Sequence, residues 1–171
     1  LGFVGTFFLN DFLKESYNYR KLKLERRIEK LLNKKVELGD YSGIRLFGIS
    51  LANPKITDNS NINSEIRAKR IYVGIMPLKS LINQRWVIRI SPFQAEINID
   101  KDFIKRTKSY KDIGNINKSK IKYDLNFNLN KNVIFNFKNF GLDTKVKGDL
   151  IYRSNNRQIL GNLKSNFEGR G

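Results

Sequence analysis

The chain has 171 residues and a formal net charge of +17 at pH 7, with no cysteine and no histidine. These absences exclude disulfides, thiolate metal sites and a cysteine nucleophile, and they remove the commonest general base and metal ligand. No P-loop, dinucleotide-binding glycine motif or nucleophile elbow occurs. We therefore expect that the protein is not an enzyme and that it has no catalytic residue, metal or cofactor. The charge favours an anionic partner, either nucleic acid or an acidic membrane surface, or it marks an ordinary solvated face.

The apolar start of the chain predicts the end of a membrane anchor. Residues 1–13 (LGFVGTFFLNDFL) carry no charge before Asp11. Because crossing a bilayer takes about 20 apolar residues, this run is too short to span one alone. We predict that it is the last part of an anchor helix whose start lies upstream, and that the chain is a fragment of a longer protein. The alternative is the amphipathic end of a helix in a water-soluble protein.

Residues 14–35 predict a basic amphipathic helix, with nine Lys or Arg against three Glu and Asn33 as a suitable helix stop. A narrow apolar stripe at helical spacing is formed by Leu24, Ile28, Leu31 and Leu32. Such a helix beside an apolar segment commonly lies on an anionic lipid surface. The residues predicted to contact that surface are Lys14, Arg20, Lys21, Lys23, Arg26, Arg27 and Lys30.

From residue 36 onward the sequence predicts β-structure. A hairpin is expected first, with strands at 36–41 and 44–51 and its turn at Ser42-Gly43. A proline opens a helical turn at 77–82, a polar loop is expected at 57–64, and the basic segment 105–119 is expected to be disordered. Short turns between consecutive strands favour an antiparallel meander. The other predicted strands are 66–75, 86–100, 120–129, 133–140, 142–153 and 158–167.

The predicted strand at 86–100 changes the face that carries its apolar residues. Apolar side chains occupy even positions from 86 to 90 and odd positions from 93 to 99. Side chains alternate between the two faces of a strand, so this change requires a bulge or bend. We expect it at Ser91-Pro92, where the parity switches.

One face of the predicted sheet is apolar. In Tyr123-Asp-Leu-Asn-Phe-Asn-Leu129 every second residue is apolar, and those between are Asp or Asn. Such a face packs against a second layer in most proteins. Alternatively, it is the open concave side of a curved sheet that binds lipid chains. The residues that would line this side are Trp86, Ile88, Ile90, Phe93, Ile97, Ile99, Leu125, Phe127, Leu129, Val133, Phe135 and Phe137.

The alternative function is nucleic-acid binding by a basic β domain. The net charge fits this function, but sheets that bind RNA carry aromatic residues among basic ones on their exposed face. Here Tyr123, Phe127, Phe135 and Phe137 belong to the apolar face. We therefore expect no nucleic-acid partner.

The segment at 35–51 (KVELGDYSGIRLFGISL) resembles the membrane-proximal part of the TamB (translocation and assembly module) family, most closely its cyanobacterial and chloroplast branch. The order that follows is also similar: a strand at 66–75, Pro77-Leu-Lys-Ser-Leu, Trp86-Val-Ile-Arg-Ile and Pro92-Phe-Gln-Ala-Glu-Ile-Asn-Ile-Asp100. The related AsmA-like proteins share this layout. The resemblance covers residues 1–102, and beyond them only the β-rich pattern is shared.

With this resemblance, we expect a mainly all-β protein: an elongated, curved antiparallel sheet (a β-taco or β-groove) with an N-terminal helix. The parts are the end of an anchor helix at 1–13, the basic helix at 14–35, and a β-groove at 36–171 that continues beyond the fragment. The resemblance implies an inner (plasma) membrane anchor, with the groove facing the periplasm or intermembrane space. Membrane phospholipids and an Omp85-type outer-membrane barrel protein are the implied partners.

The implied roles are protein secretion with outer-membrane assembly, and phospholipid transport between inner and outer membranes. The basic helix departs from this picture in one respect. Charge bias places a basic flank on the cytoplasmic side of a membrane, whereas the resemblance places it on the other side.

Overall fold

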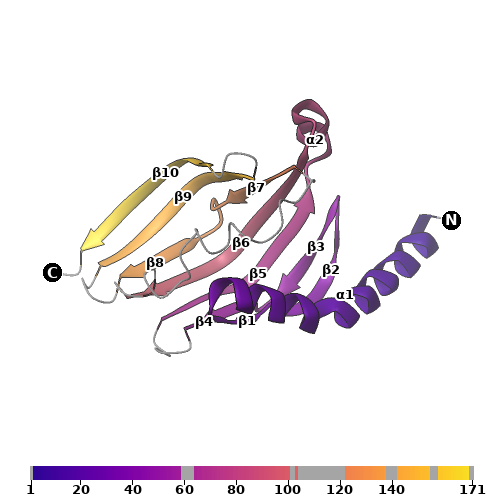
Figure 1. Ribbon diagram of the computed structural model, residues 1–171, viewed down its shortest axis with the longest axis horizontal. Helices are drawn as coiled ribbons and strands as arrows, with labels where there is room; N and C mark the ends of the chain where they lie inside the picture. Colours follow the sequence, from indigo (N-terminus) through magenta and orange to yellow (C-terminus); the bar gives the residue numbers. More distant parts are fainter. Residues whose placement is uncertain are drawn as a thin grey trace.

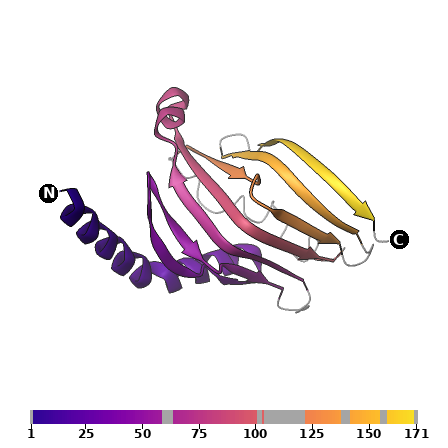
Figure 2. The same cartoon turned by 180° about the vertical axis from the view of Figure 1, so that it is seen from behind.

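The computed structural model describes residues 2–58, 64–100, 103, 122–137, 142–154 and 158–169. These residues form one curved sheet with a long helix along its N-terminal edge (Figures 1 and 2). The helices are α1 (Gly2–Leu32) and α2 (Pro77–Asn83). The strands are β1 (Lys35–Glu37), β2 (Asp40–Arg45), β3 (Gly48–Ala52), β4 (Lys55–Thr57), β5 (Glu65–Ile75), β6 (Trp86–Ile99), β7 (Tyr123–Asn128), β8 (Val133–Phe137), β9 (Leu142–Arg153) and β10 (Gln158–Gly169). The predicted mainly β fold with an N-terminal helix is confirmed.

One continuous helix, α1, covers both N-terminal segments. It ends where Asn33 adopts the left-handed conformation (φ 55°), with the Asn33 N–H donating to the Glu29 carbonyl at 2.8 Å. Asn33 is thus the helix stop that the sequence predicted. Within the part of the chain that the structure describes, no helix is both long and apolar enough to cross a membrane.

The side of α1 that faces the sheet is more polar than the predicted apolar stripe. Glu25 is buried, whereas Leu24 is 40% exposed. The Glu25 carboxylate accepts the Leu38 N–H at 2.8 Å, and Glu29 accepts the Val36 N–H at 3.1 Å. An edge strand leaves such N–H groups without a partner, and α1 supplies acceptors for two of them beside β1.

The sheet is built around two long antiparallel strands, β5 and β6. β3 and β4 lie end to end along β5, and β7 and β8 lie end to end along β6. On one side, β2 pairs with β3 and β1 pairs with β4. On the other side, β9 pairs with both β7 and β8, and β10 pairs with β9.

Two pairings correct the predicted all-antiparallel order, because β7 and β8 both run parallel to β6. The short segment at 130–132, between the predicted strands 120–129 and 133–140, does not reverse the chain as a meander requires but leads from β7 into β8. Parallel neighbours need a connection of a dozen or more residues, and the chain between Ile99 and Tyr123 is long enough. The predicted disordered loop at 105–119 lies outside the described residues, as does most of the predicted polar loop at 57–64.

The predicted turn at Ser42-Gly43 is wrong. Arg45 pairs with Gly48, so the turn of this hairpin is Leu46-Phe47, with Phe47 left-handed (φ 61°). Gly43 (φ 122°) instead lies at a shift of register inside β2. Glycine favours turns and bulges for the same reason, its freedom at positive φ, and its presence alone does not tell them apart.

A crease crosses the sheet and divides it into two halves. Left-handed residues mark it on either side of β5, at Gly39 (φ 82°), Asn53 (53°), Gln94 (49°), Asn132 (53°) and Gly148 (137°), whereas β5 itself has none. Hydrogen bonds cross it from the Asn53 N–H to the Lys69 carbonyl (3.1 Å) and from the Gln94 N–H to the Lys131 carbonyl (3.0 Å). We call the half with β2, β3 and β7 the α2 half, and the half with β1, β4 and β8 the β1 half.

The parity switch on β6 therefore occurs at Gln94, two residues after the predicted Ser91-Pro92. A left-handed residue turns the side chains that follow it to the other face, so apolar residues stay on one side of the sheet across the crease. The core spans this line: Ala95, Leu129, Val133 and Val146 are buried together. Phe127 from the α2 half and Phe135 from the β1 half pack against them.

Candidate functional site

The predicted lining residues lie on one face of the sheet, with one exception. In the α2 half, Ile88 is beside Leu125 and Ile90 beside Phe127. In the β1 half, Ile97 is beside Phe135. We call this side the apolar face and the opposite side the polar face. The predicted residues on the apolar face are Trp86, Ile88, Ile90, Ile97, Ile99, Leu125, Phe127, Leu129, Val133, Phe135 and Phe137.

Phe93 is the exception, because it lies on the polar face. It precedes the left-handed Gln94 and keeps the parity of Arg89 and Ser91 on the same strand. Its side chain is 38% exposed and lines a hollow with both of these residues. The sequence showed the parity switch but not its position, and Phe93 lies between the predicted and the actual switch.

Helix α1 lies over the apolar face at the β1–β2 edge of the sheet. Tyr41, which pairs with Leu51, donates its hydroxyl to Asn10 Oδ1 at 2.9 Å. Its ring lies 6.3 Å from the ring of Tyr17, centroid to centroid. Further along this face, Ile88 and Phe127 are half-buried and Trp86 is 53% exposed.

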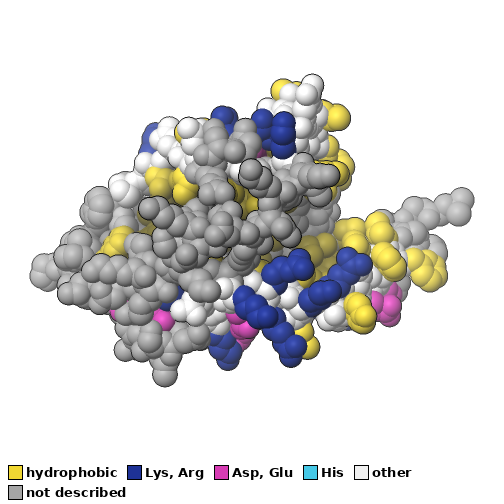
Figure 3. Space-filling view, in the orientation of Figure 1, with side chains coloured by type: hydrophobic (Ala, Val, Ile, Leu, Met, Phe, Trp, Pro, Cys, Tyr) yellow, Lys and Arg dark blue, Asp and Glu magenta, His cyan; other side chains and the backbone are white. Residues whose placement is uncertain are grey.

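An exposed apolar cluster adjoins this face beside α2. Leu78, Leu81 and Ile82 of α2 are each at least 75% exposed. Leu81, Phe47 and Trp86 line a hollow of about 900 Å³. Trp86 belongs both to the apolar face and to this hollow, so the two apolar surfaces are continuous. Hydrophobic side chains are visible on α2 and on the N-terminal part of α1 in Figure 3.

Most of the cations predicted to contact a membrane are exposed on α1, where Figure 3 shows a group of basic side chains. The exposed ones are Lys14, Arg20, Lys23, Arg26, Arg27 and Lys30. Lys21 differs, because its ammonium group forms an ion pair with Asp40 at 3.1 Å. It therefore helps to hold α1 against β2.

Tyr17 fixes the middle of α1 to the sheet. Its hydroxyl donates to the Gly39 carbonyl at 2.8 Å, and its side chain is 8% exposed. Burial, together with the nearby Glu25 and Asp40 carboxylates, raises the pKa of Tyr17 from 10.0 to about 12. The tyrosine is therefore neutral at physiological pH, which keeps its hydrogen bond to the crease.

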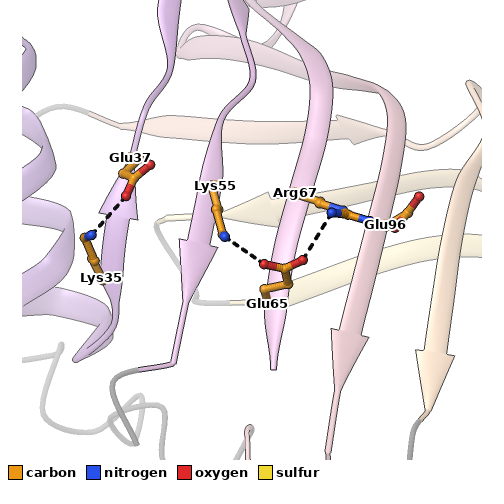
Figure 4. Close-up of polar contacts among 6 residues, drawn as sticks. All are labelled: Lys35, Glu37, Lys55, Glu65, Arg67 and Glu96. Carbon is orange, nitrogen blue, oxygen red and sulfur yellow. Dashed lines mark hydrogen bonds and ion pairs between the residues drawn. The ribbon is translucent and has the colours of Figure 1, made fainter. Parts of the chain in front are cut away.

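The polar face of the β1 half carries a ladder of ion pairs across four strands (Figure 4). Lys55 lies 2.9 Å from Glu65, and Arg67 lies 2.7 Å from Glu96 and 3.5 Å from Glu65. At the edge, Lys35 pairs with its neighbour Glu37 at 3.1 Å. The hydrogen bond and charge of Glu96 raise the pKa of Arg67. The cations of this ladder are therefore neutralised within the sheet.

The polar face carries a second group of cations, which the sequence did not predict. Arg45, Arg70, Arg89 and Lys131 surround a hollow of about 590 Å³ in the α2 half. They come from three strands and one link, so their proximity depends on strand pairing, which the sequence did not reveal. The only local signal was that Arg70 and Arg89 alternate with the apolar residues of their strands.

Among the residues that the structure describes, no group of three or more His, Cys, Asp or Glu is arranged to hold a metal ion. Comparison with models of known protein families and with curated protein sequences gives no match. The function is therefore inferred from the apolar face, the exposed apolar cluster and the basic helix.

Proposed function

We propose that this chain is the membrane-proximal part of a cell-envelope bridge of the translocation and assembly module type. In this proposal α1 belongs to an inner-membrane anchor, and the sheet faces the periplasm or intermembrane space. The bridge transports phospholipids between the inner and outer membranes. It also supports protein secretion and outer-membrane assembly, with an Omp85-type barrel protein as its outer-membrane partner.

One observation carries this proposal: the apolar face continues across the crease without a charged side chain on β6, β7 or β8. It leads from Trp86 in the α2 half to Phe137 in the β1 half, and it is buried where it crosses the crease at Leu129 and Val133. An unpaired charge in hydrocarbon costs several kcal/mol, so an uninterrupted apolar surface is what moving acyl chains require. A sheet that served only as a spacer would have no need of this continuity.

Two further surfaces support contact with a membrane: the exposed cluster of α2 at the α2-half end of the path, and α1, whose basic stretch runs beside β1. The exposed leucines and isoleucine of α2 adjoin the apolar face through Trp86, and exposed apolar patches commonly mark contact sites for membranes or proteins. The exposed cations of α1 favour anionic headgroups. A lipid leaving such a membrane would meet apolar side chains from the first contact onward.

Photo-crosslinking tests the lipid path directly. A photoreactive amino acid at Ile88 or Phe127 should capture acyl chains in membranes. The same group at Glu96 or Lys147 on the polar face should capture few, because these side chains are separated from the path by the sheet. Equal capture from both faces would contradict the proposal.

Charge substitution separates a lipid conduit from a passive tether. Ile88→Asp and Phe127→Asp in the full-length protein should stop lipid exchange between the two membranes, because each places a carboxylate on the path. Lys147→Asp, at an exposed position on the polar face, is the matched control and should leave exchange unchanged. If both path variants accumulate normally and still exchange lipid, the tether is the better account.

The alternative of a nucleic-acid-binding domain is tested by competition at matched salt. The aromatic residues of β7 and β8 lie on the apolar face, which argues against base stacking on these strands. We expect anionic vesicles to bind better than a single-stranded oligonucleotide. The reverse order would favour the alternative.

A further inference from the structure

The polar face of the α2 half holds four cations that form no ion pair with any described residue. Arg45 ends β2, Arg70 lies on β5, Arg89 lies on β6, and Lys131 reaches the same hollow from the link between β7 and β8. Among the described residues, no carboxylate lines this hollow, and none of the four cations forms an ion pair. This local excess of positive charge has no counterpart in the ladder of the β1 half.

Two buried serines hold two of these arginines in place. Arg45 Nε donates to Ser50 Oγ at 3.4 Å, and Arg89 Nε donates to Ser91 Oγ at 3.2 Å. Ser50 and Ser91 are only 2% and 5% exposed, so their side chains are held in place by the sheet. Because the serines take the Nε groups, the two terminal nitrogens of each guanidinium are left for another acceptor.

The floor between Arg45 and Arg89 is formed by the Tyr72 ring, which lies over two glycines. Across the sheet, Arg45 pairs with Gly48, Gly48 with Gly74, and Gly74 with Arg89. The Tyr72 ring lies over the two glycines, since a Cβ at Gly74 would overlap the Tyr72 hydroxyl. That hydroxyl donates to the Leu46 carbonyl at 2.8 Å, which fixes the ring. The glycines thus make room for the Tyr72 ring, which lies between Arg45 and Arg89 as one wall of the hollow.

The acidic residues described near this hollow interact with other residues and not with its four cations. On the same strand as Arg70, Arg67 faces Glu96, whereas Arg70 itself faces Phe93. Two acids lie further across the polar face: Asp124, which pairs with Arg85 at 3.4 Å, and Asp149, which accepts the Asn128 amide at 2.8 Å. Unpaired cations held together repel one another, and a bound anion would relieve this repulsion.

We propose that this hollow binds the phosphate group of a small organic phosphate. Guanidinium groups match phosphate oxygens two at a time, which favours phosphate over a monovalent anion. Leu46, Tyr72 and Phe93 add an apolar wall, which an organic substituent would contact and inorganic phosphate would not. The same chemistry is offered by a soluble phosphate ester and by a lipid headgroup. The site lies on the polar face, so it does not depend on the proposed lipid path.

The first test is calorimetric titration of the chain with glycerol 3-phosphate and with inorganic phosphate. We expect saturable binding, tighter for the ester. Arg45→Gln/Arg70→Gln/Arg89→Gln should weaken it by about tenfold or more, since each hydrogen bond to a charged group contributes measurably. The control Lys145→Gln/Lys147→Gln/Lys164→Gln removes the same charge from exposed positions on β9 and β10 and should change affinity less than about twofold.

A second variant tests whether binding depends on the guanidinium groups rather than on net positive charge, and whether the chain still folds. Arg45→Lys/Arg70→Lys/Arg89→Lys keeps the charge but loses the paired donors, so it should also weaken binding while the circular dichroism spectrum is retained. Full affinity in this variant, equal weakening in the two glutamine variants, or no saturable binding of either probe would overturn the proposal.

Vesicles distinguish the two sources of phosphate. Arginine-dependent binding to vesicles of phosphatidic acid, above that to phosphatidylcholine, would assign the site to a headgroup, and binding of the soluble ester alone would assign it to a free metabolite. If the arginine substitutions weaken binding of a single-stranded DNA oligonucleotide more than binding of the ester at matched salt, the surface binds nucleic acid and the proposal fails.

Discussion

Lys34 Nζ lies 3.1 Å from Asp58 Oδ2, and both side chains are only 2% exposed. This ion pair joins the residues just after α1 to the end of β4. The ammonium group also lies 4.6 Å from the centroid of the Phe103 ring. Its geometry is that of a charge contact rather than of an aligned hydrogen bond. A buried pair of this kind is costly to break, because both charges lie in a site that is closed to water.

Lys34→Met should therefore lower the free energy of unfolding by about 3–5 kcal/mol, as measured by urea denaturation. The matched control is Lys35→Met, whose partner Glu37 is exposed, and it should cost less than about 1 kcal/mol. Lys34→Met/Asp58→Asn should recover part of the loss, because neither charge of the pair then remains in the buried site. Similar losses for Lys34→Met and Lys35→Met would contradict this account.

Because the pKa of Tyr17 is raised, we expect the protein to lose stability at high pH. This pKa is raised from 10.0 to about 12 in the folded protein, so the neutral phenol stabilises the fold fully below pH 10. This contribution is lost as the pH rises from 10 to 12, and it amounts to roughly 3 kcal/mol. Urea denaturation at pH 8, 10 and 11 should show a shallower decline for Tyr17→Phe than for the wild type. Parallel declines would rule out this role for Tyr17.

The crease should tolerate a side chain at Gly39 less well than the hairpin tolerates one at Gly43. Both glycines have positive φ, so alanine is strained at either by about 1–2 kcal/mol. A Cβ at Gly39 would also overlap the Ala52 carbonyl oxygen, whereas nothing lies within 4 Å of a Cβ at Gly43. Gly39→Ala should thus show a clearly lower melting temperature than Gly43→Ala. Equal melting temperatures would mean that the contact is relieved without cost.

The exposed cations of α1 should govern binding to anionic vesicles. Substitution of Arg20, Lys23 or Arg27 by Gln should each weaken binding by up to about 1 kcal/mol in flotation assays at low salt. Lys21→Gln is the matched control, because Lys21 is already paired with Asp40 and should contribute less. Raising the salt concentration should reduce all of these effects. Salt-independent binding would show that the helix does not act through its charge.

Local patterns predicted those elements whose signals are local. Strand β5 follows from the alternation of its apolar residues, α2 from Pro77, and the end of α1 from Asn33. Strand direction was not predictable in the same way. The sequence at 130–132 suits both a reversing turn and a link between collinear strands, and only pairing with β6 and β9 decides between them.

The same distinction applies to the functional surfaces. The apolar face was predictable because its residues alternate within single strands, and Phe93 was misplaced because the parity switch was assigned two residues too early. The hollow of Arg45, Arg70 and Arg89 was not predictable, since these residues become neighbours only through the pairing of β2, β3, β5 and β6.

The crease also determines how this sheet tolerates insertions and deletions. Removing one residue from a strand inverts every side chain beyond that point. Deletion of Gln94 would thus turn Ala95 and Ile97 toward the polar side and bring Glu96 onto the apolar one. The link between β7 and β8 and strand β9 carry their own left-handed residues, Asn132 and Gly148, so length changes would have to occur on several strands together. The apolar face therefore depends on the matched lengths of adjacent strands more than on any single side chain.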